Sequence, residues 1–472
     1  MKSGIIFSFF TGVIDTAHGE KYRKIMKYFI PEFISALVLY SLVGLLDTYF
    51  IAGLKSTETY ATLGVTNTFL HYMTKFFEGI QVGGLILVGK YNGAGDFKTA
   101  GKSFTDAFWV AAITGFVISS MMFFGAYWVY YFCGVPEDMI YLGAPYLRIV
   151  AVKIFFMALY LTFVGFMRGV KDTKTPMIIF SIGAVVFIIL DYILIYGKLG
   201  FPKMGFQGSA VASVIQYLLM FILAAVIVFF SKKNKIYEIN LFAPFQSLSR
   251  IITLIKLSIP VVIDKCTVAF SYLWLGRMIA PMGKIGLATF AIVKDFERIA
   301  LIPAVALASV VTLIVSNDYG KRDWVGIKSN AKKIVFLGAF MVSAILIVIA
   351  IFPHFFVHIF DKKGDFTDLA VAVIPVLSVL IIFDVVQLIL SGAMRGASNV
   401  KTVMITRLAV IGIWFMPCSY FLSEVNIENT AVKFMLIYSL FYIGNLIMAI
   451  VYITRFRGEK WKTLDPSGNN SK

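Results

Sequence analysis

Twelve apolar runs, each long enough to cross a lipid bilayer, occupy most of this 472-residue chain. A membrane-spanning helix needs about 20 apolar residues. We place the runs at residues 28–54, 60–88, 104–130, 138–167, 175–197, 206–230, 252–278, 285–316, 333–353, 367–394, 402–422 and 431–454. Charged residues make up only 15% of the chain, against about 25% in soluble domains. The sequence therefore predicts an all-α membrane protein and excludes a soluble globule or a disordered chain.

The segments outside the runs are short and leave no room for a soluble domain. Residues 1–27 are expected to form an N-terminal interfacial segment, because their short apolar stretch lacks a clean signal-peptide cleavage site. Residues 231–251 form the longest connection, with an amphipathic composition suited to a membrane surface. Residues 456–472 are expected to form a cytoplasmic tail.

Lysine and arginine are distributed unevenly between the two sides that twelve spans define. The side that carries both termini holds 28 of them, in the loops and at the span ends, and the opposite side holds seven, including Lys55, Lys198, Lys362 and Lys363. Positive charge marks the cytoplasm. The net charge of +17 is therefore read as a topology signal, with both termini cytoplasmic and no nucleic-acid partner.

The chain also contains an internal repeat. The stretch VGFMRGVKDTKTPM at 164–177 returns as SGAMRGASNVKTVM at 391–404, and residues 87–97 resemble 314–324 at the same offset of 227. Six spans per repeat give both copies the same orientation. We therefore expect two six-helix lobes, 28–230 and 252–455, related by a pseudo-two-fold axis along the membrane normal, as in alternating-access transporters. The glycines of the repeated motif are expected to permit a tight turn.

Two acids and a hydroxyl of the first lobe are predicted to lie at similar depths. Asp47 is eight residues before Lys55 and Asp191 is seven before Lys198, so both lie about 10–12 Å below the outer surface. Ser213 lies about 15 Å deep. Acids inside a membrane are costly and usually functional. This set suits Na⁺, which prefers oxygen ligands, or protons. A structural ion pair between Asp47 and Arg148 is the alternative.

The second lobe supplies the candidates Asp384, Glu297 and Asp264, of which the first two are expected near the midplane. Structural pairing is the alternative for two of them: Glu297 has Lys294 three residues away, and Asp264 has Lys265 beside it. In the first lobe, Glu78 and Lys75 are expected to neutralise each other.

Other kinds of site have little support in the sequence. His354 and His358 stand four residues apart but lack the glutamate of a zinc-protease helix, so they are expected to be interface histidines. The three cysteines have no metal-binding or disulfide spacing. No phosphate-binding glycine motif occurs. Transport would therefore draw its energy from an ion gradient or a partner, without a cofactor.

Six stretches together resemble the multidrug and toxic compound extrusion (MATE) family: GLLDTYF (44–50), LVGKYNGAGD (87–96), FMRGVKDTKTPM (166–177), LDYILIYGKLGFPKMGFQGSAVAS (190–213), AIVKDFERIALIPAVAL (291–307) and FDVVQLILSGAMRG (383–396). The resemblance covers about residues 22–456. It implies two six-helix lobes around a cavity, and export of organic cations and other drugs against Na⁺ or H⁺.

The resemblance also carries functional positions onto this chain. Asp47 and Asp191 match the first-lobe cation site, and Ser213 falls where the family often has threonine. Asp384 and Glu297 match acids of the second lobe. Phe187 departs from the family pattern, because an asparagine often stands four residues before the second aspartate. Loss of that oxygen ligand favours protons over Na⁺ in the first lobe.

The sequence therefore predicts a cation-coupled antiporter of the cell (inner) membrane, acting as a monomer on small, often cationic molecules, with membrane lipid as its other partner. A flippase for lipid-linked saccharides is the alternative, because its anionic substrate would need cavity bases such as Lys153, Lys265, Lys294 and Arg298. A membrane-embedded enzyme has no catalytic constellation to support it.

Overall fold

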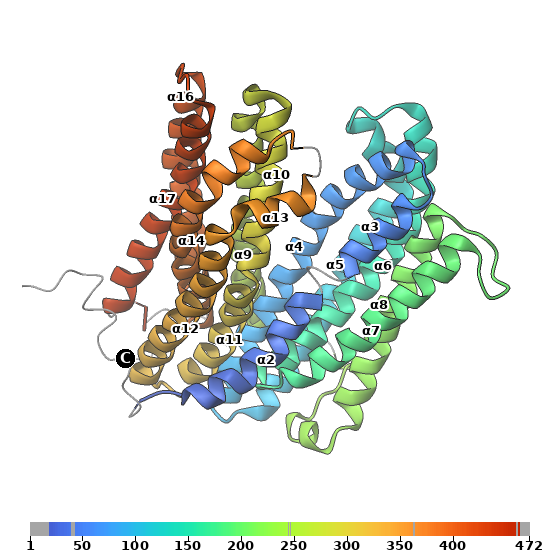
Figure 1. The fold of residues 1–472 in the computed structure, drawn as a ribbon. Helices are drawn as coiled ribbons and strands as arrows, with labels where there is room; N and C mark the ends of the chain where they lie inside the picture. The colour runs from blue at the N-terminus through green and yellow to red at the C-terminus, as the bar shows by residue number, and fades with distance from the viewer. Residues whose placement is uncertain are drawn as a thin grey trace, which may run out of the picture. The chain divides into compact units, whose positions relative to one another are not determined.

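The computed structural model describes residues 18–38, 43–243, 245, 247–361, 364–458 and 461–462. Within these ranges the chain is helical and has no β-strand (Figure 1). The first half contains α2 (Tyr22–Leu37), α3 (Gly44–Ala52), α4 (Thr57–Gly93), α5 (Phe97–Phe132), α6 (Glu137–Gly169), α7 (Lys174–Tyr196), α8 (Phe206–Phe230) and the 3-10 helix η2 (Lys232–Tyr237). The second half contains α9 (Leu248–Ile279), η3 (Ala280–Met282), α10 (Gly283–Ala300), α11 (Ile302–Gly320), α12 (Trp324–Ile351), α13 (Pro353–Phe360), α14 (Thr367–Gly396), α15 (Val400–Ala409), the π-helix η4 (Val410–Phe415), α16 (Met416–Glu424) and α17 (Thr430–Arg457).

Each of the twelve predicted spans coincides with helical structure in the described residues. Nine stretches among them are long and apolar enough to cross a membrane, namely α5, α6, α7, α8, α11, α12, α14, residues 400–424 and α17. The prediction of an all-α, multi-pass membrane protein is confirmed. Residues 1–17 of the predicted interfacial segment, Lys362, Lys363 and most of the tail lie outside the described residues.

Two spans that were predicted as single helices are interrupted. The span 285–316 divides at Leu301, and Pro303 occupies the first turn of α11. The span 402–422 passes through a π-helical segment, and Pro417 occupies the first turn of α16. Proline lacks the N–H that a continuous helix would use and fits best in a first turn. Hydropathy alone does not detect such breaks.

Several helices also begin earlier than predicted. The starts expected at 60, 104 and 333 lie at 57, 97 and 324, because each helix is capped by a polar side chain before its apolar run begins. Ser56 accepts the N–H of Thr59, and Asp96 accepts that of Thr99. Asp323 caps α12 in the same way.

The helices pack into two compact units. One unit, here the N-unit, spans Ile34–Val262; the other, here the C-unit, comprises the residues before and after it. The division falls inside α2 and inside α9, so each of these helices contributes to both units. The lobe boundaries 28–230 and 252–455 differ from this division and stay a prediction.

The internal repeat reappears in the backbone of the two units. Lys171 and Ser398, 227 residues apart, both have positive φ, at 64° and 60°. Gly95 and Arg322, at the same separation, have φ of 81° and 60°. Left-handed conformations are uncommon for residues with a side chain. Their recurrence at one offset indicates that both units use the same turns.

The glycines of the repeated motif have a different role from the predicted one, because the positive φ falls on Lys171 and Ser398. A Cβ on Gly165 would lie 2.8 Å from the carbonyl oxygen of Gln81, and one on Gly392 would lie 2.6 Å from that of Ala308. Both pairs are again 227 residues apart. These glycines therefore allow close helix packing, of α6 on α4 and of α14 on α11.

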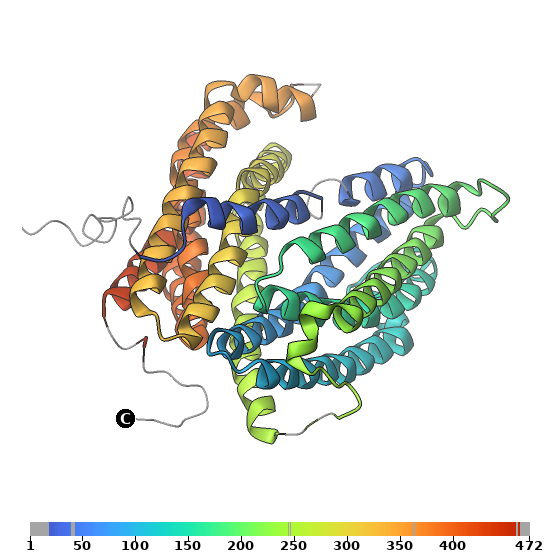
Figure 2. The same ribbon diagram turned by 90° about the horizontal axis from the view of Figure 1, so that it is seen from below.

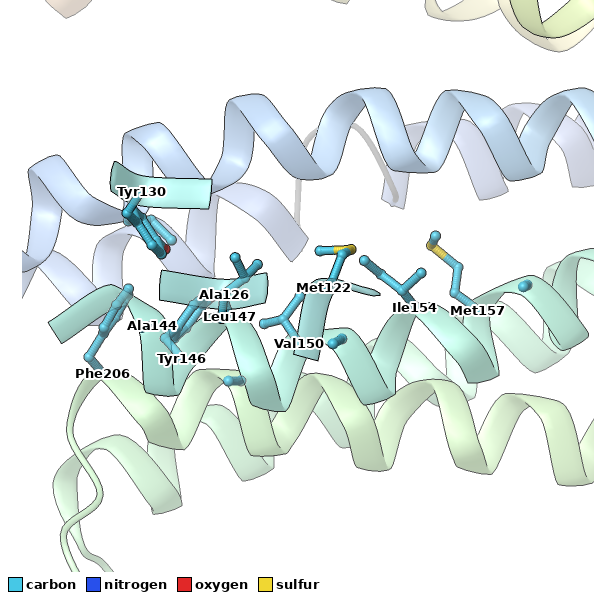
Figure 3. Close-up of a cluster of buried hydrophobic side chains, with 14 of the residues drawn as sticks. Met122, Ala126, Tyr130, Ala144, Tyr146, Leu147, Val150, Ile154, Met157 and Phe206 are labelled. Carbon is cyan, nitrogen blue, oxygen red and sulfur yellow. The ribbon is translucent and has the colours of Figure 1, made fainter. Parts of the chain in front are cut away.

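The core of the N-unit lies where α5 and α6 pack together. Figure 3 shows this cluster, with Met122 and Ala126 from α5 beside Leu147, Val150 and Ile154 from α6. At one end the rings of Tyr146 and Phe206 stack, with centroids 4.0 Å apart and planes 6° apart. This stack joins α6 to the start of α8, next to the acids described below.

Candidate functional site

A direct side-chain hydrogen bond connects α3 with α8 in the N-unit. The hydroxyl of Ser209 donates to Oδ1 of Asp47 at 2.6 Å. Ser209 is buried, and Asp47 is partly buried. Asp47 is held in place from the same helix, because Ile51, one turn later, is 1% exposed and packs into the core cluster.

Asp191 of α7 is the second acid at this place. Its side chain is fully buried, and neither carboxylate oxygen has a hydrogen-bond partner in the described part of the chain. Asp191 interacts electrostatically with Asp47 and neighbours Ser209, whose hydroxyl is already donated to Asp47. The structure thus brings together the two acids that the sequence singled out.

Close contact between α3 and α7 supports this arrangement. The hydroxyl of Tyr196 donates to the carbonyl oxygen of Phe50 at 2.8 Å. A Cβ on Gly53 would lie 2.2 Å from that hydroxyl, so glycine is needed where the tyrosine crosses α3. These contacts lie three to six residues beyond the acids along the chain.

Two polar side chains of α6 complete the surroundings. Lys153 and Tyr146 both interact electrostatically with Asp47. The ammonium of Lys153 lies 5.7 Å from the ring centre of Tyr217. The alternative pairing of Asp47 with Arg148 is not observed in the described residues: Arg148 is exposed, and the hydrogen bond to Asp47 comes from Ser209.

The hydroxyl that meets Asp47 was missed by sequence reasoning. Ser213, the predicted ligand, donates its hydroxyl to the carbonyl oxygen of Ala210 at 2.7 Å. Ser209 stands one turn earlier on the same face of α8. The available signal was its spacing of four from Ser213. Phe187 is 4% exposed and packs in an apolar cluster with Leu194, so no oxygen precedes Asp191 by one turn.

The C-unit holds a second acidic cluster, around Glu297 of α10. Glu297 is 1% exposed and accepts hydrogen bonds from Tyr272 at 2.7 Å and from Tyr438 at 3.0 Å. These tyrosines come from α9 and α17. Lys294 lies over the ring of Phe290 instead of pairing with Glu297. Neither tyrosine was predicted, because no local spacing connects them to Glu297.

Asp384 of α14 belongs to the same cluster. It interacts electrostatically with Glu297 and with Arg407 of α15. The hydroxyl of Tyr442 is also close to Glu297 and is buried without a geometric hydrogen-bond partner among the described residues. The two acids of the C-unit that were expected near the midplane are thus neighbours, as are Asp47 and Asp191 of the N-unit.

Asp264 is held very differently from the other acids. It is 1% exposed and accepts hydrogen bonds from two guanidinium groups, those of Arg407 and Arg395, the latter at 2.8 Å. Lys265 was its expected partner, and the arginines come from α15 and α14 instead. Permanent pairing with two cations suits a structural role better than reversible ion binding.

The remaining charged candidates lie apart from these clusters. Lys75 and Glu78 form an ion pair at 3.0 Å, which confirms that prediction. His354 and His358 are both exposed. Within the described residues, no group of three or more His, Cys, Asp or Glu side chains could hold a metal ion.

The MatE family profile matches residues 33–193 and 260–421. The chain belongs to the MatE family. The two matched stretches begin 227 residues apart, which is the offset of the internal repeat. The predicted resemblance to multidrug and toxic compound extrusion proteins is therefore confirmed.

Curated relatives are similar over most of their length. The chain is 22% identical over 398 residues to the probable multidrug resistance protein NorM of Thermotoga maritima, which covers 83% of each chain. It is 24% identical over 406 residues to the multidrug resistance protein NorM of Photobacterium profundum, covering 86% of this chain and 88% of the relative.

Solved structures share the fold. A MATE protein in the straight conformation superposes with a TM-score of 0.84 at 19% identity, covering 95% of this chain and 97% of the other. An outward-facing multidrug resistance MATE family transporter of the MOP superfamily superposes with a TM-score of 0.83 at 20% identity, covering 92% and 94%. The twelve-helix, two-lobe layout expected from the sequence fits this fold.

Proposed function

We propose that the protein is a secondary active antiporter that exports organic cations, drugs or metabolites in exchange for H⁺ or Na⁺. Membership of the MatE family supports this function, as do the names of the relatives, which are multidrug resistance proteins. The observation that carries the proposal is the buried, unpartnered carboxylate of Asp191 beside Asp47.

The chemistry follows from the cost of burying negative charge. Two neighbouring carboxylates in an apolar interior repel each other and have lost their hydration. A proton or a cation bound between Asp47 and Asp191 removes both penalties. The pair is therefore stable when loaded and unstable when empty, and this difference can drive the exchange of access from one side to the other.

Protons are the coupling ion that the N-unit site favours. A Na⁺ ion needs several oxygen ligands, by analogy with other hard cations. The described oxygens at this site come from Asp47, Asp191, Ser209 and Tyr146, while Phe187 contributes only carbon. The Asp384 and Glu297 cluster is proposed as a second cation site, where tyrosine hydroxyls add oxygens.

The remaining features of the proposal concern location and partners. The protein resides in the cell (inner) membrane with both termini in the cytoplasm, an orientation that the excess of Lys and Arg on one side supports. The substrate is a small molecule, the energy comes from an ion gradient without a cofactor, and neither catalysis nor nucleic-acid binding is part of the function. The protein acts as a monomer with lobes 28–230 and 252–455.

The test is transport in proteoliposomes that contain the full-length protein and carry either a proton gradient or a Na⁺ gradient. Efflux of a fluorescent organic cation should follow the proton gradient and should be abolished by Asp47→Asn and by Asp191→Asn. Asp295→Asn is the matched control, because Asp295 forms a partly exposed ion pair with Arg298 at 3.2 Å. Unchanged efflux in the first two variants would refute the proposal.

A flippase for a lipid-linked saccharide is the second candidate. Lys153 favours it, because this base interacts with the Asp47 site without a direct ion pair in the described residues. An anionic headgroup would attract it. Arg298 gives the flippase function less support, because it is paired with Asp295 on the helix surface. Lys153→Gln should abolish flipping of a fluorescent lipid phosphate if this function is correct, and should leave cation export measurable if it is not.

A further inference from the structure

The connection between α8 and α9 is held against α4 and α5 of its own unit. Tyr237 is buried and donates its hydroxyl to Asn92 at 2.8 Å. Trp109 donates its indole N–H to the carbonyl oxygen of Leu241 at 2.7 Å. Figure 2 allows residues 231–243 to be followed from the green end of α8. These residues therefore form an ordered element with a defined outward surface.

Apolar side chains stand on that outward surface. Phe242 is 98% exposed, and it directly follows Leu241, whose carbonyl is held by Trp109. Its own N–H is donated to Asn240 Oδ1 at 2.9 Å, so the backbone that carries the ring is ordered. Ile236 is 52% exposed. A fixed, fully displayed phenyl ring is unfavourable in water and favourable in a membrane interface.

Three lysines accompany these apolar side chains. Lys232, Lys233 and Lys235 belong to η2 and are all exposed. The nearby acid, Glu238, is already paired with Lys98 of α5 at 2.8 Å. This pairing leaves an excess of positive charge next to exposed hydrocarbon. That combination is typical of segments that lie on anionic bilayers.

The position of the connection also favours an anionic membrane surface as its partner. It begins directly after Phe230, the last residue of the apolar helix α8, and ends at Leu248, the first residue of α9; these residues are 81% and 70% exposed. The surface therefore lies where α8 leaves the hydrocarbon. With both termini in the cytoplasm, as proposed, this surface meets the cytoplasmic leaflet, whose lipids carry negative charge.

We propose that Lys232, Lys233, Lys235, Ile236 and Phe242 form a docking surface for anionic phospholipid of the cytoplasmic leaflet. Phe242 enters the interface, and the three lysines contact lipid phosphates. The connection between the two halves of the chain is thus a membrane-bound segment. This inference uses the orientation from the proposed function but none of its transport chemistry.

The test uses the full-length protein in nanodiscs of neutral phosphatidylcholine alone or mixed with phosphatidylglycerol. Cys133, Cys266 and Cys418 are replaced by serine so that a single thiol reacts with the label, and Phe242→Cys carries an environment-sensitive bimane group. In the mixed discs, lipids brominated on their acyl chains should quench the label severalfold more than aqueous iodide does. The triple variant K232Q/K233Q/K235Q should reduce this preference at least twofold.

The matched control is K55Q/K198Q/K203Q, which removes three exposed lysines on the opposite side and should change nothing. Native mass spectrometry of unlabelled protein provides a second measurement: the K232Q/K233Q/K235Q variant should retain fewer phosphatidylglycerol molecules than the control variant. If iodide quenches the label equally in neutral and in mixed discs, the proposal is overturned. The surface would then be a candidate binding site for a protein partner instead. Equal lipid retention by both triple variants would overturn the role of the lysines. Neither readout depends on transport.

Discussion

Ser209 donates a hydrogen bond to Asp47 Oδ1 at 2.6 Å, while the neighbouring Asp191 has no hydrogen-bond partner within the described residues. One hydroxyl therefore serves a site with two carboxylates. This asymmetry assigns them different parts in the proposed exchange: Asp47 is the better stabilised anion, and Asp191 is the group that most needs a proton or cation.

Replacing the hydroxyl should strengthen proton binding, because the hydrogen bond stabilises the ionised form of Asp47. Hydrogen bonds to charged groups contribute about 1.5–3 kcal/mol, so Ser209→Ala should raise the apparent affinity for protons by roughly 10- to 150-fold. Initial export rates measured against proton concentration would detect this change. Ser213→Ala is the matched control, because its hydroxyl bonds to the carbonyl of Ala210. Equal effects of the two variants would contradict the assignment.

Asp264 should be required for stability more than for ion exchange. Its removal leaves Arg395 and Arg407 without their shared carboxylate, and breaking a buried ion pair costs about 3–5 kcal/mol. Asp264→Ala should therefore lower the thermal unfolding temperature in detergent by several degrees. Asp384→Asn should reduce transport with little change in that temperature. A stable, inactive Asp264→Ala variant would argue for a role in coupling instead.

The close packing at the repeated glycines predicts matched effects in the two units. Gly165→Ala and Gly392→Ala would each place a methyl group against a backbone carbonyl, and such overpacking costs about 1–3 kcal/mol. Both variants should unfold at lower temperature than the wild type. Gly125→Ala, where a Cβ meets no atom within 4 Å, should be neutral or stabilising. If only one of the two repeat variants is destabilised, the equivalence of the units fails.

Asp361, which follows α13, should confer sensitivity to acid. Burial raises its pKa, but hydrogen bonds from the N–H groups of Phe366, Gly364 and Asp365 and from the Thr367 hydroxyl hold the pKa below its usual value. A depressed pKa stabilises the folded state above the unfolded pKa of about 3.9. That stability is lost as pH falls through the folded value. Unfolding temperatures of wild type and Asp361→Ala should differ at pH 7 and converge below about pH 4.

Much of the fold could be predicted because bilayer crossing imposes a simple length rule on apolar runs. The repeat at an offset of 227 was equally visible, since the same turns and packing contacts recur. The breaks at Leu301 and Val410 were not predictable from hydropathy, because one proline or a π-helical segment changes hydrogen bonding without changing composition.

The candidate site, too, could be predicted only in part from the sequence. Asp47 and Asp191 could be found because a buried charge is costly wherever it stands in a span. Their partners could not, because Ser209 is an ordinary helix residue until α3 packs against it. In the same way, Tyr438 is 141 residues from Glu297, and the arginines that hold Asp264 are at least 131 residues away. Only tertiary structure brings such pairs together.

Phe187 offers a direct test of ion selectivity in the N-unit. It stands one turn before Asp191 on α7 and is buried among carbon atoms. Phe187→Asn would add an amide oxygen on the same helix face, so a Na⁺ gradient should begin to drive export. Proteoliposomes with opposed Na⁺ and proton gradients measure this change. Phe187→Leu is the control for lost packing and should stay proton-driven, because it supplies no oxygen. Sodium-independent transport in Phe187→Asn would show that the missing ligand does not determine the coupling ion.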